Sequence, residues 1–207
     1  MAFDPFSPRK VARQSRARGT IDEIIQASAQ IVSRHGLERL TTNHIAERAG
    51  VSVGSLYQYF PGKDAVLHAL IEREFNRTVD ALVARIEATC AATTPLDQAI
   101  AGLVDLVFEL NARNAPFLRQ LVLAAVSLKH LRFTLDNDVR VLAALRAKLA
   151  EYGDDVDAEG LELATFVALY ALKGVQIGMV FGSREHDNEH LRALLVRMMC
   201  ALLAPPR

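Results

Sequence analysis

All seven prolines of this 207-residue chain lie near its ends or between apolar segments, and no other sequence feature limits the fold as strongly. Within those segments apolar residues recur at steps of three and four, which is the period of an amphipathic helix. No segment shows the sustained alternation of a β-strand. Proline ends or kinks a helix, so prolines are expected between helices. They stand at positions 5, 8, 61, 95, 116, 205 and 206. The sequence therefore predicts an all-α protein.

Local signals at the segment ends set the expected helix boundaries. Thr20-Ile21-Asp22-Glu23 is a capping box, which predicts that the first helix begins at Thr20. Gly36 suits the end of that helix, because glycine adopts the left-handed conformation easily. Pro116 predicts a break between two separate helices. About nine helices are expected: a short one between Thr41 or Thr42 and Gly50, and others at residues 20–35, 53–59, 63–88, 95–113, 116–128, 132–151, 157–181 and 187–204.

Composition excludes a mainly disordered chain and a disulfide framework. Hydrophobic residues make up 51% of the sequence and charged residues 23%, so the chain can bury a sizeable core. The two cysteines, Cys90 and Cys200, lack the paired spacing of a zinc site. The 24 basic and 24 acidic residues cancel, but residues 1–63 carry nine basic residues against five acidic ones. Electrostatic attraction to nucleic acid is therefore expected from the N-terminal part.

The sequence predicts a cytoplasmic protein without a membrane partner. Its N-terminal residues are polar and basic, and they lack the apolar core of a secretion signal. The segment from Leu163 to Gly182 is apolar enough to raise the alternative of a membrane helix. Lys173 near its middle argues against that alternative, because burying a lysine at the centre of a bilayer is costly.

Two short helices separated by a tight turn form the most informative local pattern. Thr41 or Thr42 caps the first helix, and Gly50 ends it. Ser52 then caps the second helix, which stops at Phe60-Pro61-Gly62. Two helices joined by a turn of this kind make a helix-turn-helix, expected at about residues 41–60. In proteins that bind DNA with this unit, the second helix enters the major groove.

This region resembles the DNA-binding domain of the TetR family of bacterial transcriptional regulators. The resemblance covers residues 20–74 and is most specific in the stretch IAERAGVSVGSLYQYFPGKDAVL, which ends at Leu67. It implies a DNA-binding domain at residues 1–64, with a flexible basic arm at 1–19, followed by a ligand-binding and dimerisation domain at 65–207. The implied function is a ligand-responsive repressor that binds a palindromic double-stranded operator as a homodimer.

The resemblance also implies which residues contact DNA. Residues of the second short helix face the major groove, and residues around it meet the DNA backbone. The groove-facing set is Val53, Gly54, Ser55 and Tyr57, and the backbone set is Thr42, Asn43, Tyr59 and Lys63. Arg16 and Arg18 belong to the arm, which is expected to enter the minor groove or follow the phosphates. Two alternatives stay open: a core position for Tyr57, and a solvated tail in place of the arm.

Glycines at four-residue spacing mark the long apolar helix before the last one. Gly174, Gly178 and Gly182 remove side chains along one line, so that another helix can approach closely. The line serves either packing inside one subunit or a two-fold seam between subunits. A helix that is apolar nearly all round needs cover on several sides, which favours the seam. In the TetR family the last two helices pair across the dimer axis. The last helix is expected to add Leu191, Leu194, Leu195, Met198 and Leu202.

Aromatic rings spread over the later helices are candidates for lining an apolar ligand cavity. They are Phe108, Phe117, Phe133, Phe166 and Tyr170. Ordinary core packing is the equal alternative for each ring. We expect a small, mainly apolar effector and no cofactor. His186 and His190 are four residues apart, but an exposed helix start explains them better than a metal site.

Two rival functions stay open. One is a DNA-binding regulator controlled by a protein partner, with no small-molecule ligand. The more remote one is an enzyme with a helical active site. The sequence contains no phosphate-binding glycine loop, nucleophile elbow or His-Glu-x-x-His motif, so we expect no enzyme.

Overall fold

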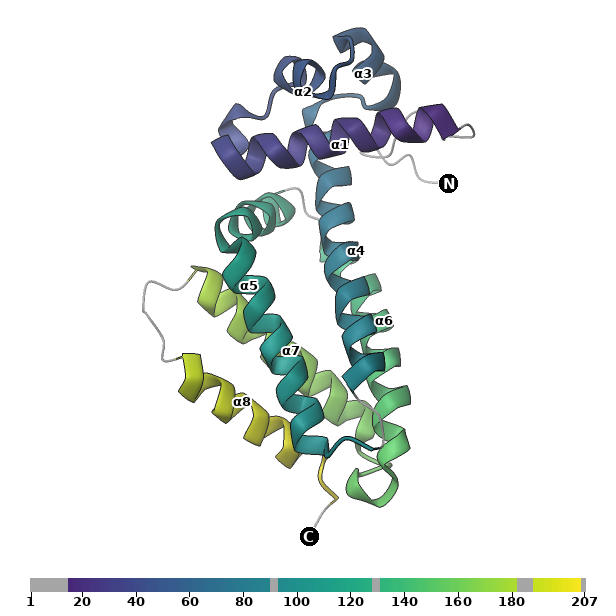
Figure 1. Ribbon diagram of the computed structural model, residues 1–207, viewed down its shortest axis with the longest axis vertical. Helices are drawn as coiled ribbons and strands as arrows, with labels where there is room; N and C mark the ends of the chain where they lie inside the picture. Colours follow the sequence, from purple (N-terminus) through teal and green to yellow (C-terminus); the bar gives the residue numbers. More distant parts are fainter. Residues whose placement is uncertain (1–14, 90–92, 128–130, 182–187, 206–207) are drawn as a thin grey trace. The chain divides into compact units, whose positions relative to one another are not determined.

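The computed structural model describes residues 15–89, 93–127, 131–181 and 188–205, and these residues form α-helices and two short 3₁₀ helices with no β-strand (Figure 1). The elements are α1 (Ser15–His35), η1 (Leu37–Arg39), α2 (Thr42–Ala49), α3 (Val53–Tyr59), α4 (Lys63–Thr89), α5 (Leu96–Ser127), α6 (Leu131–Leu149), η2 (Ala150–Asp155), α7 (Leu161–Phe181) and α8 (Asn188–Leu203). The all-α prediction is confirmed.

The chain divides into two compact units. The head unit comprises the described residues within 1–75 and 116–131, and the body unit comprises those within 76–115 and 132–207. The part of α5 after Pro116 therefore belongs to the same unit as α1, α2 and α3, although it is far from them in sequence. The functional boundary predicted at residue 64 stays a prediction.

The head unit is built around one apolar core. Helices α1, α2 and α3 gather around the N-terminal part of α4 (Figure 1). Each contributes fully buried side chains to the core, such as Ile24 from α1, Ile45 from α2 and Leu56 from α3. Burying one such side chain stabilises the fold by roughly 1.5–3 kcal/mol. This core therefore holds α2 and α3 in place, because helices so short are unstable alone.

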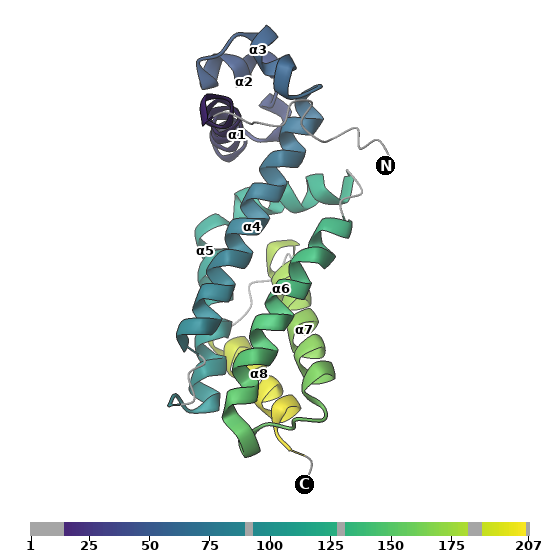
Figure 2. The ribbon, with the colours of Figure 1, turned by 90° about the vertical axis from the view of Figure 1, so that its right-hand side faces the viewer.

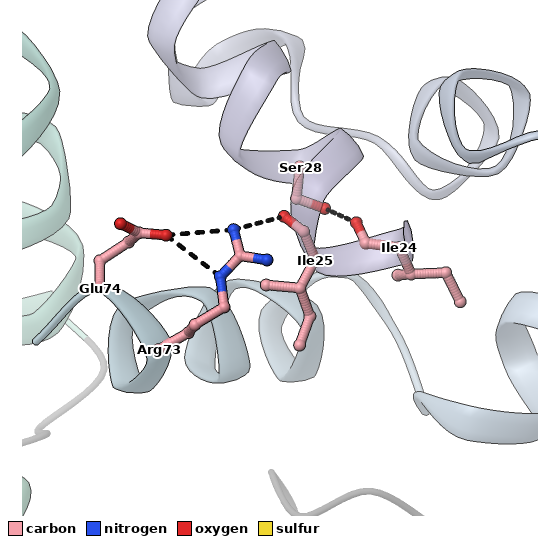
Figure 3. A network of polar contacts seen from close by, with 5 residues as sticks. All are labelled: Ile24, Ile25, Ser28, Arg73 and Glu74. Atoms are coloured by element: carbon pink, nitrogen blue, oxygen red, sulfur yellow. Dashed lines mark hydrogen bonds and ion pairs between the residues drawn. The ribbon is translucent and has the colours of Figure 1, made fainter. Parts of the chain in front are cut away.

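Polar contacts add to the packing between α1 and α4 (Figure 3). Arg73 of α4 donates through Nη2 to the backbone carbonyl of Ile25 in α1 at 3.4 Å, and its Nε donates to Glu74 at 3.1 Å. Within α1, the buried hydroxyl of Ser28 donates to the carbonyl of Ile24 at 2.8 Å. Buried polar groups need such partners, so these bonds let Ser28 and Arg73 lie inside the helix contact.

The body unit contains the C-terminal part of α4, the first part of α5, and α6, α7 and α8 (Figure 2). Arg140 of α6 pairs with Asp80 of α4 at 2.6 Å, and Arg146 of α6 pairs with Glu162 of α7 at 3.1 Å. Exposed ion pairs of this kind contribute at most about 1 kcal/mol each. The apolar core contributes more, and α8 enters it through Leu195, Met199 and Leu203.

The predicted start of the first helix at Thr20 is wrong. α1 begins at Ser15, so Thr20 and Glu23 lie inside the helix and not at its N-cap. Arginine and alanine have high helix propensity, and the Arg-Ala-Arg segment before Gly19 lengthens the helix. Residues 15–19, predicted as part of a flexible arm, are therefore helical. The rest of that arm, residues 1–14, lies outside the described residues.

Two further predicted boundaries are wrong. α5 is one helix from Leu96 to Ser127 with Pro116 inside it, not two helices separated by the proline. The proline removes one helical hydrogen bond, and it marks the point where α5 passes from the body unit into the head unit. α7 begins at Leu161 and not at residue 157, because Asp157 Oδ1 accepts from the Glu159 amide in a turn before the helix.

α7 is the most apolar helix of the described chain. Its residues Leu161–Met179 are long and apolar enough to cross a membrane by length and composition, a test that core helices of globular proteins also pass. One side of α7 packs into the body core, and Lys173 near its middle is paired with Asp138 of α6. The opposite side of α7 carries the exposed apolar residues Leu163, Phe166, Val167 and Ile177.

Candidate nucleic-acid interface

Capping side chains fix both helices of the helix-turn-helix. Thr41 Oγ1 accepts from the His44 amide at 3.2 Å, and Ser52 Oγ accepts from the Ser55 amide at 3.0 Å. Each helix therefore has an N-cap that satisfies an otherwise unpaired amide. Gly50 closes α2 at φ 68° and ψ 26°, a left-handed conformation that favours glycine. These caps and the glycine turn are confirmed as predicted.

α3 turns one side toward the head core and the other outward. Leu56 is fully buried, while Val53 and Tyr59 are partly buried against the same core. Gly54 is exposed, and Tyr57 keeps 45% of its surface exposed. A core position for Tyr57 does not fit a ring that is nearly half exposed. The exposed side of α3 is therefore the side that carries Gly54 and Tyr57.

Polar groups of α2 and α3 meet on that outward side. Thr42 Oγ1 lies 3.5 Å from the hydroxyl of Tyr57, at the outer limit of a hydrogen bond. Asn43, the next residue of α2, is exposed. We call the set Thr42, Asn43, Gly54 and Tyr57 the α2–α3 face. It offers hydroxyl and amide groups that can bind phosphate oxygens or base edges.

The remaining predicted DNA residues are placed as follows. Ser55 Oγ lies 2.8 Å from Ser52 Oγ, so its hydroxyl is shared within the helix cap. Lys63 is exposed as the first residue of α4, and residues 60–62 separate it from the end of α3. Arg18 is exposed on α1, and the side chain of Arg16 lies outside the described part of the chain. Both described cations therefore lie at the surface of the head.

The glycine line of α7 faces outward. Gly174 and Gly178 are exposed, and a Cβ atom added at either would meet nothing within 4 Å. Packing inside the subunit therefore does not explain them. Gly182 lies outside the described residues. Large apolar side chains are also exposed on α7 and α8, namely Leu163, Phe166, Val167, Ile177, Leu194 and Met198. We call these residues and the two glycines the α7–α8 face.

Three residues predicted for the subunit seam, Leu191, Leu195 and Leu202, are not on that face. Leu195 is buried in the body core of its own chain, with 4% of its surface exposed. Neighbouring helix positions differ by about 100° in direction, so Leu194 points outward while Leu195 points inward. Leu191 and Leu202 are partly buried against the same core, and Met198 is exposed.

The aromatic residues predicted to line one cavity do not lie together. Phe108 is buried in the body core, whereas Phe117 packs against the head core. Phe166 is 47% exposed and contacts Tyr170, with ring centroids 4.6 Å apart. The side chain of Phe133 lies outside the described part of the chain. Phe108 and Phe117 therefore belong to different cores, while Phe166 and Tyr170 form a pair on α7.

A buried carboxylate that the sequence did not single out joins α6 to α7. Asp138 is 7% exposed and accepts from Lys173 Nζ at 2.6 and 2.8 Å and from the Tyr170 hydroxyl at 2.9 Å. The hydrogen bond to Asp138, with burial and the charge of Asp138, raises the pKa of Tyr170 above its usual value. Lys173 stood out in the sequence as a charge in an apolar helix, and such a charge requires a partner of this kind.

Two family models match this chain. Residues 24–70 match the model for bacterial regulatory proteins of the tetR family, and residues 95–203 match the model for the tetracyclin repressor-like C-terminal domain. The second match alone covers more than half of the chain. The chain belongs to the TetR family. The first match contains the whole helix-turn-helix, and the second contains the described parts of α5 to α8.

Relatives and solved structures agree with this assignment. The chain is 29% identical over 96 residues to the uncharacterized regulator YvdT of Bacillus subtilis. This match covers 46% of this chain and 47% of YvdT. It is 43% identical over 72 residues to the transcriptional repressor KstR of Mycolicibacterium smegmatis. This match covers 35% of this chain and 34% of KstR. These matches span about half or less of each relative.

The fold is that of solved TetR-family regulators. The crystal structure of a TetR transcription regulator from Haloarcula marismortui matches with a TM-score of 0.67 at 24% identity, covering 90% of this chain and 99% of that one. At this level of identity the likeness concerns the fold and not the ligand or the DNA sequence.

Proposed function

We propose that this TetR-family chain is a transcriptional repressor that binds a palindromic operator as a homodimer and is released by a small, mainly apolar effector. It acts in the cytoplasm, where its DNA is. The observation that carries the proposal is the α2–α3 face. Its helices are capped and packed on one apolar core, and its polar groups stay exposed on one side.

The α2–α3 face suits a duplex in shape and in chemistry. A helix as short as α3 fits the major groove, and its partner α2 meets the adjacent backbone. The exposed Gly54 lets the helix backbone come close to the bases, since no side chain stands there. The exposed Tyr57 can pack on a thymine methyl or donate to a phosphate, and Lys63 adds a cation at the start of α4.

The α7–α8 face supports the homodimer. Its exposed apolar side chains come from two helices of the same unit, and burial of such surface drives association. Gly174 and Gly178 allow a second helix to approach the α7 backbone closely. A two-fold contact through this face gives the two heads the symmetry that a palindrome has. Two α3 helices then reach successive major grooves, roughly 34–36 Å apart.

The effector part of the proposal rests on family membership and on the division of the chain into two units. Both α4 and α5 continue from one unit into the other, so a ligand that changes the body unit can act on the head through them. The scattered positions of the aromatic residues leave the lining of the effector site undefined.

Selection from a random pool tests the DNA part. The full-length chain is incubated with random-sequence duplexes, and the bound fraction is amplified and sequenced over several rounds. We expect enrichment of one inverted repeat, because two identical heads select two identical half-sites. The Tyr57→Ala variant, selected in parallel, is expected to enrich it much less. Failure of the wild type to enrich any sequence would contradict the proposal.

A thermal-shift screen of apolar and aromatic compounds tests the effector part. A compound at a hundred times its dissociation constant adds about 2.7 kcal/mol to the stability of the native state. Stabilising compounds are then tested for release of the selected duplex. Release supports a small-molecule effector. If stabilising compounds leave the DNA complex intact, control by a protein partner becomes the better account.

A further inference from the structure

The second part of α5 is a structural component of the head unit. Leu121 is fully buried, and Ala124 and Ala125 are nearly so, in the same cluster as the core residues of α1, α2 and α3. Pro116 is the first residue of α5 that belongs to this unit. The head core is therefore incomplete without a helix that lies outside the segment of the TetR DNA-binding match, residues 24–70.

A side chain of this helix caps the connection between α1 and α2. The backbone N–H of Leu37, the first residue of η1, donates to Gln120 Oε1 at 2.8 Å. The residue before it, Gly36, has no side chain with which to cap η1. The first amides of a helix need an acceptor from outside it. Gln120 supplies that acceptor from a distant part of the sequence.

The backbone at this point is shaped for that contact. Gly36 has φ 81° and ψ 170°, a conformation that side chains rarely adopt. A Cβ atom at this position would lie 3.4 Å from Gln120 Oε1, an ordinary contact, so the positive φ and not a lack of space favours glycine here. The glycine thus allows the turn that presents the Leu37 amide to Gln120.

From these contacts we infer that Gln120 is a positioning residue for DNA binding. Gln120 caps the turn at Leu37. Three residues further on, Leu40 is buried, and the next residue, Thr41, caps α2. The first residue of α2 is Thr42, which belongs to the α2–α3 face. Gln120 therefore fixes where α2 begins, without touching DNA itself. The inference rests on the proposed DNA-binding function and adds a residue that acts through the α1–α2 connection.

Two substitutions of Gln120 separate capping from packing. Gln120→Leu keeps a side chain of similar size but removes the acceptor, and Gln120→Glu keeps an acceptor oxygen. Leu123→Ala is the matched control, because Leu123 is 53% exposed on the same part of α5. For each full-length variant we measure affinity for the duplex selected by the wild type, affinity for a random-sequence duplex, and the exchange rate of the Leu37 amide hydrogen.

We expect Gln120→Leu to bind the selected duplex roughly three- to tenfold more weakly, the effect of removing one hydrogen bond, with random-duplex affinity unchanged. The Leu37 amide exchanges faster in this variant. Gln120→Glu and Leu123→Ala match the wild type. Wild-type affinity of Gln120→Leu for the selected duplex, or equal loss on both duplexes, overturns the inference. A wild type that selects no sequence overturns the proposed function and the inference with it.

Discussion

The hydroxyl groups of Thr42 and Tyr57 lie 3.5 Å apart, which brings the first residue of α2 and the middle of α3 together on one exposed side of the head. At this distance their mutual hydrogen bond is weak, so both hydroxyls are available to another partner. Residues of the two helices can therefore act on one DNA duplex together, which is the basis of the predictions for the head.

Substitutions of Tyr57 distinguish packing from hydrogen bonding on DNA. Tyr57→Phe should weaken binding to the selected duplex by about 1 kcal/mol if the hydroxyl donates to the DNA, and very little if the ring only packs. Tyr57→Ala should weaken binding by roughly 1–3 kcal/mol, because it removes both interactions. Fluorescence anisotropy with a labelled duplex measures these differences.

Thermal unfolding provides the control for Tyr57. The ring is nearly half exposed in the free chain, so Tyr57→Ala should leave the melting temperature of the head almost unchanged. If this variant binds the selected duplex as the wild type does, or loses binding only because the head has unfolded, Tyr57 is not a DNA contact.

Gly54→Ala tests the close approach of α3 to the bases. A Cβ atom here would meet only Ser52 Oγ at 3.8 Å, an ordinary contact, so the free chain accepts it. Alanine should stabilise the helix by up to about 1 kcal/mol. Operator binding should nevertheless weaken if the α3 backbone lies against the groove. A variant that is more stable and binds equally well would exclude that approach.

Lys63→Ala should act on all DNA sequences alike. An exposed lysine after α3 contributes through a phosphate, which carries no sequence information. Binding measured over a range of salt concentrations should show a slope shallower by about 0.9 for each phosphate that the lysine no longer neutralises. Unchanged salt dependence, or a weakening confined to the selected duplex, would rule out an interaction of Lys63 with phosphate.

Gly178→Leu should separate the subunits. No atom lies within 4 Å of a Cβ added at Gly178, so the variant folds as a single chain, while a bulky side chain blocks close approach of a second α7. Sedimentation velocity should show a dimer for the wild type and a monomer for the variant. A monomeric wild type, or a dimeric variant, would place the seam elsewhere.

The bond between Tyr170 and Asp138 predicts how stability changes in alkali. The pKa of Tyr170 is raised in the folded state, so its contribution is complete below the unfolded value of about 10 and is lost as the pH rises above it. Tyr170→Phe should lower stability by roughly 1–2 kcal/mol near neutral pH. Denaturant unfolding should show the two proteins converging above pH 10, and a constant difference would contradict the assignment.

The head could be predicted in detail because its signals are local. Thr41, Gly50 and Ser52 act on residues three or four positions away, so their spacing alone fixes the ends of α2 and α3. The position of Gly174 and Gly178 on one side of α7 could also be predicted, because residues four positions apart share a helix face. Helix period specifies a face, but it does not specify which of two neighbours turns inward, and Leu195 was misplaced for that reason.

Contacts between distant segments were beyond sequence reasoning. Gln120 and Leu37 are 83 positions apart, and neither residue type marks the other as its partner. A lysine in an apolar helix is expected to have an acidic partner, but the sequence offers several acidic residues for Lys173. Asp138 is its partner because α6 packs on α7. The aromatic residues carried no signal of which core each one enters, so the sequence could not show that Phe108 lies in the body core and Phe117 against the head core.

Hydroxyl-radical footprinting of the wild-type chain on its selected duplex tests the central claim most directly. The account predicts two protected patches related by two-fold symmetry, with their centres one helical turn apart, because two α3 helices enter successive major grooves. A single unsymmetrical patch, or uniform protection along the duplex, would contradict binding by two symmetric heads.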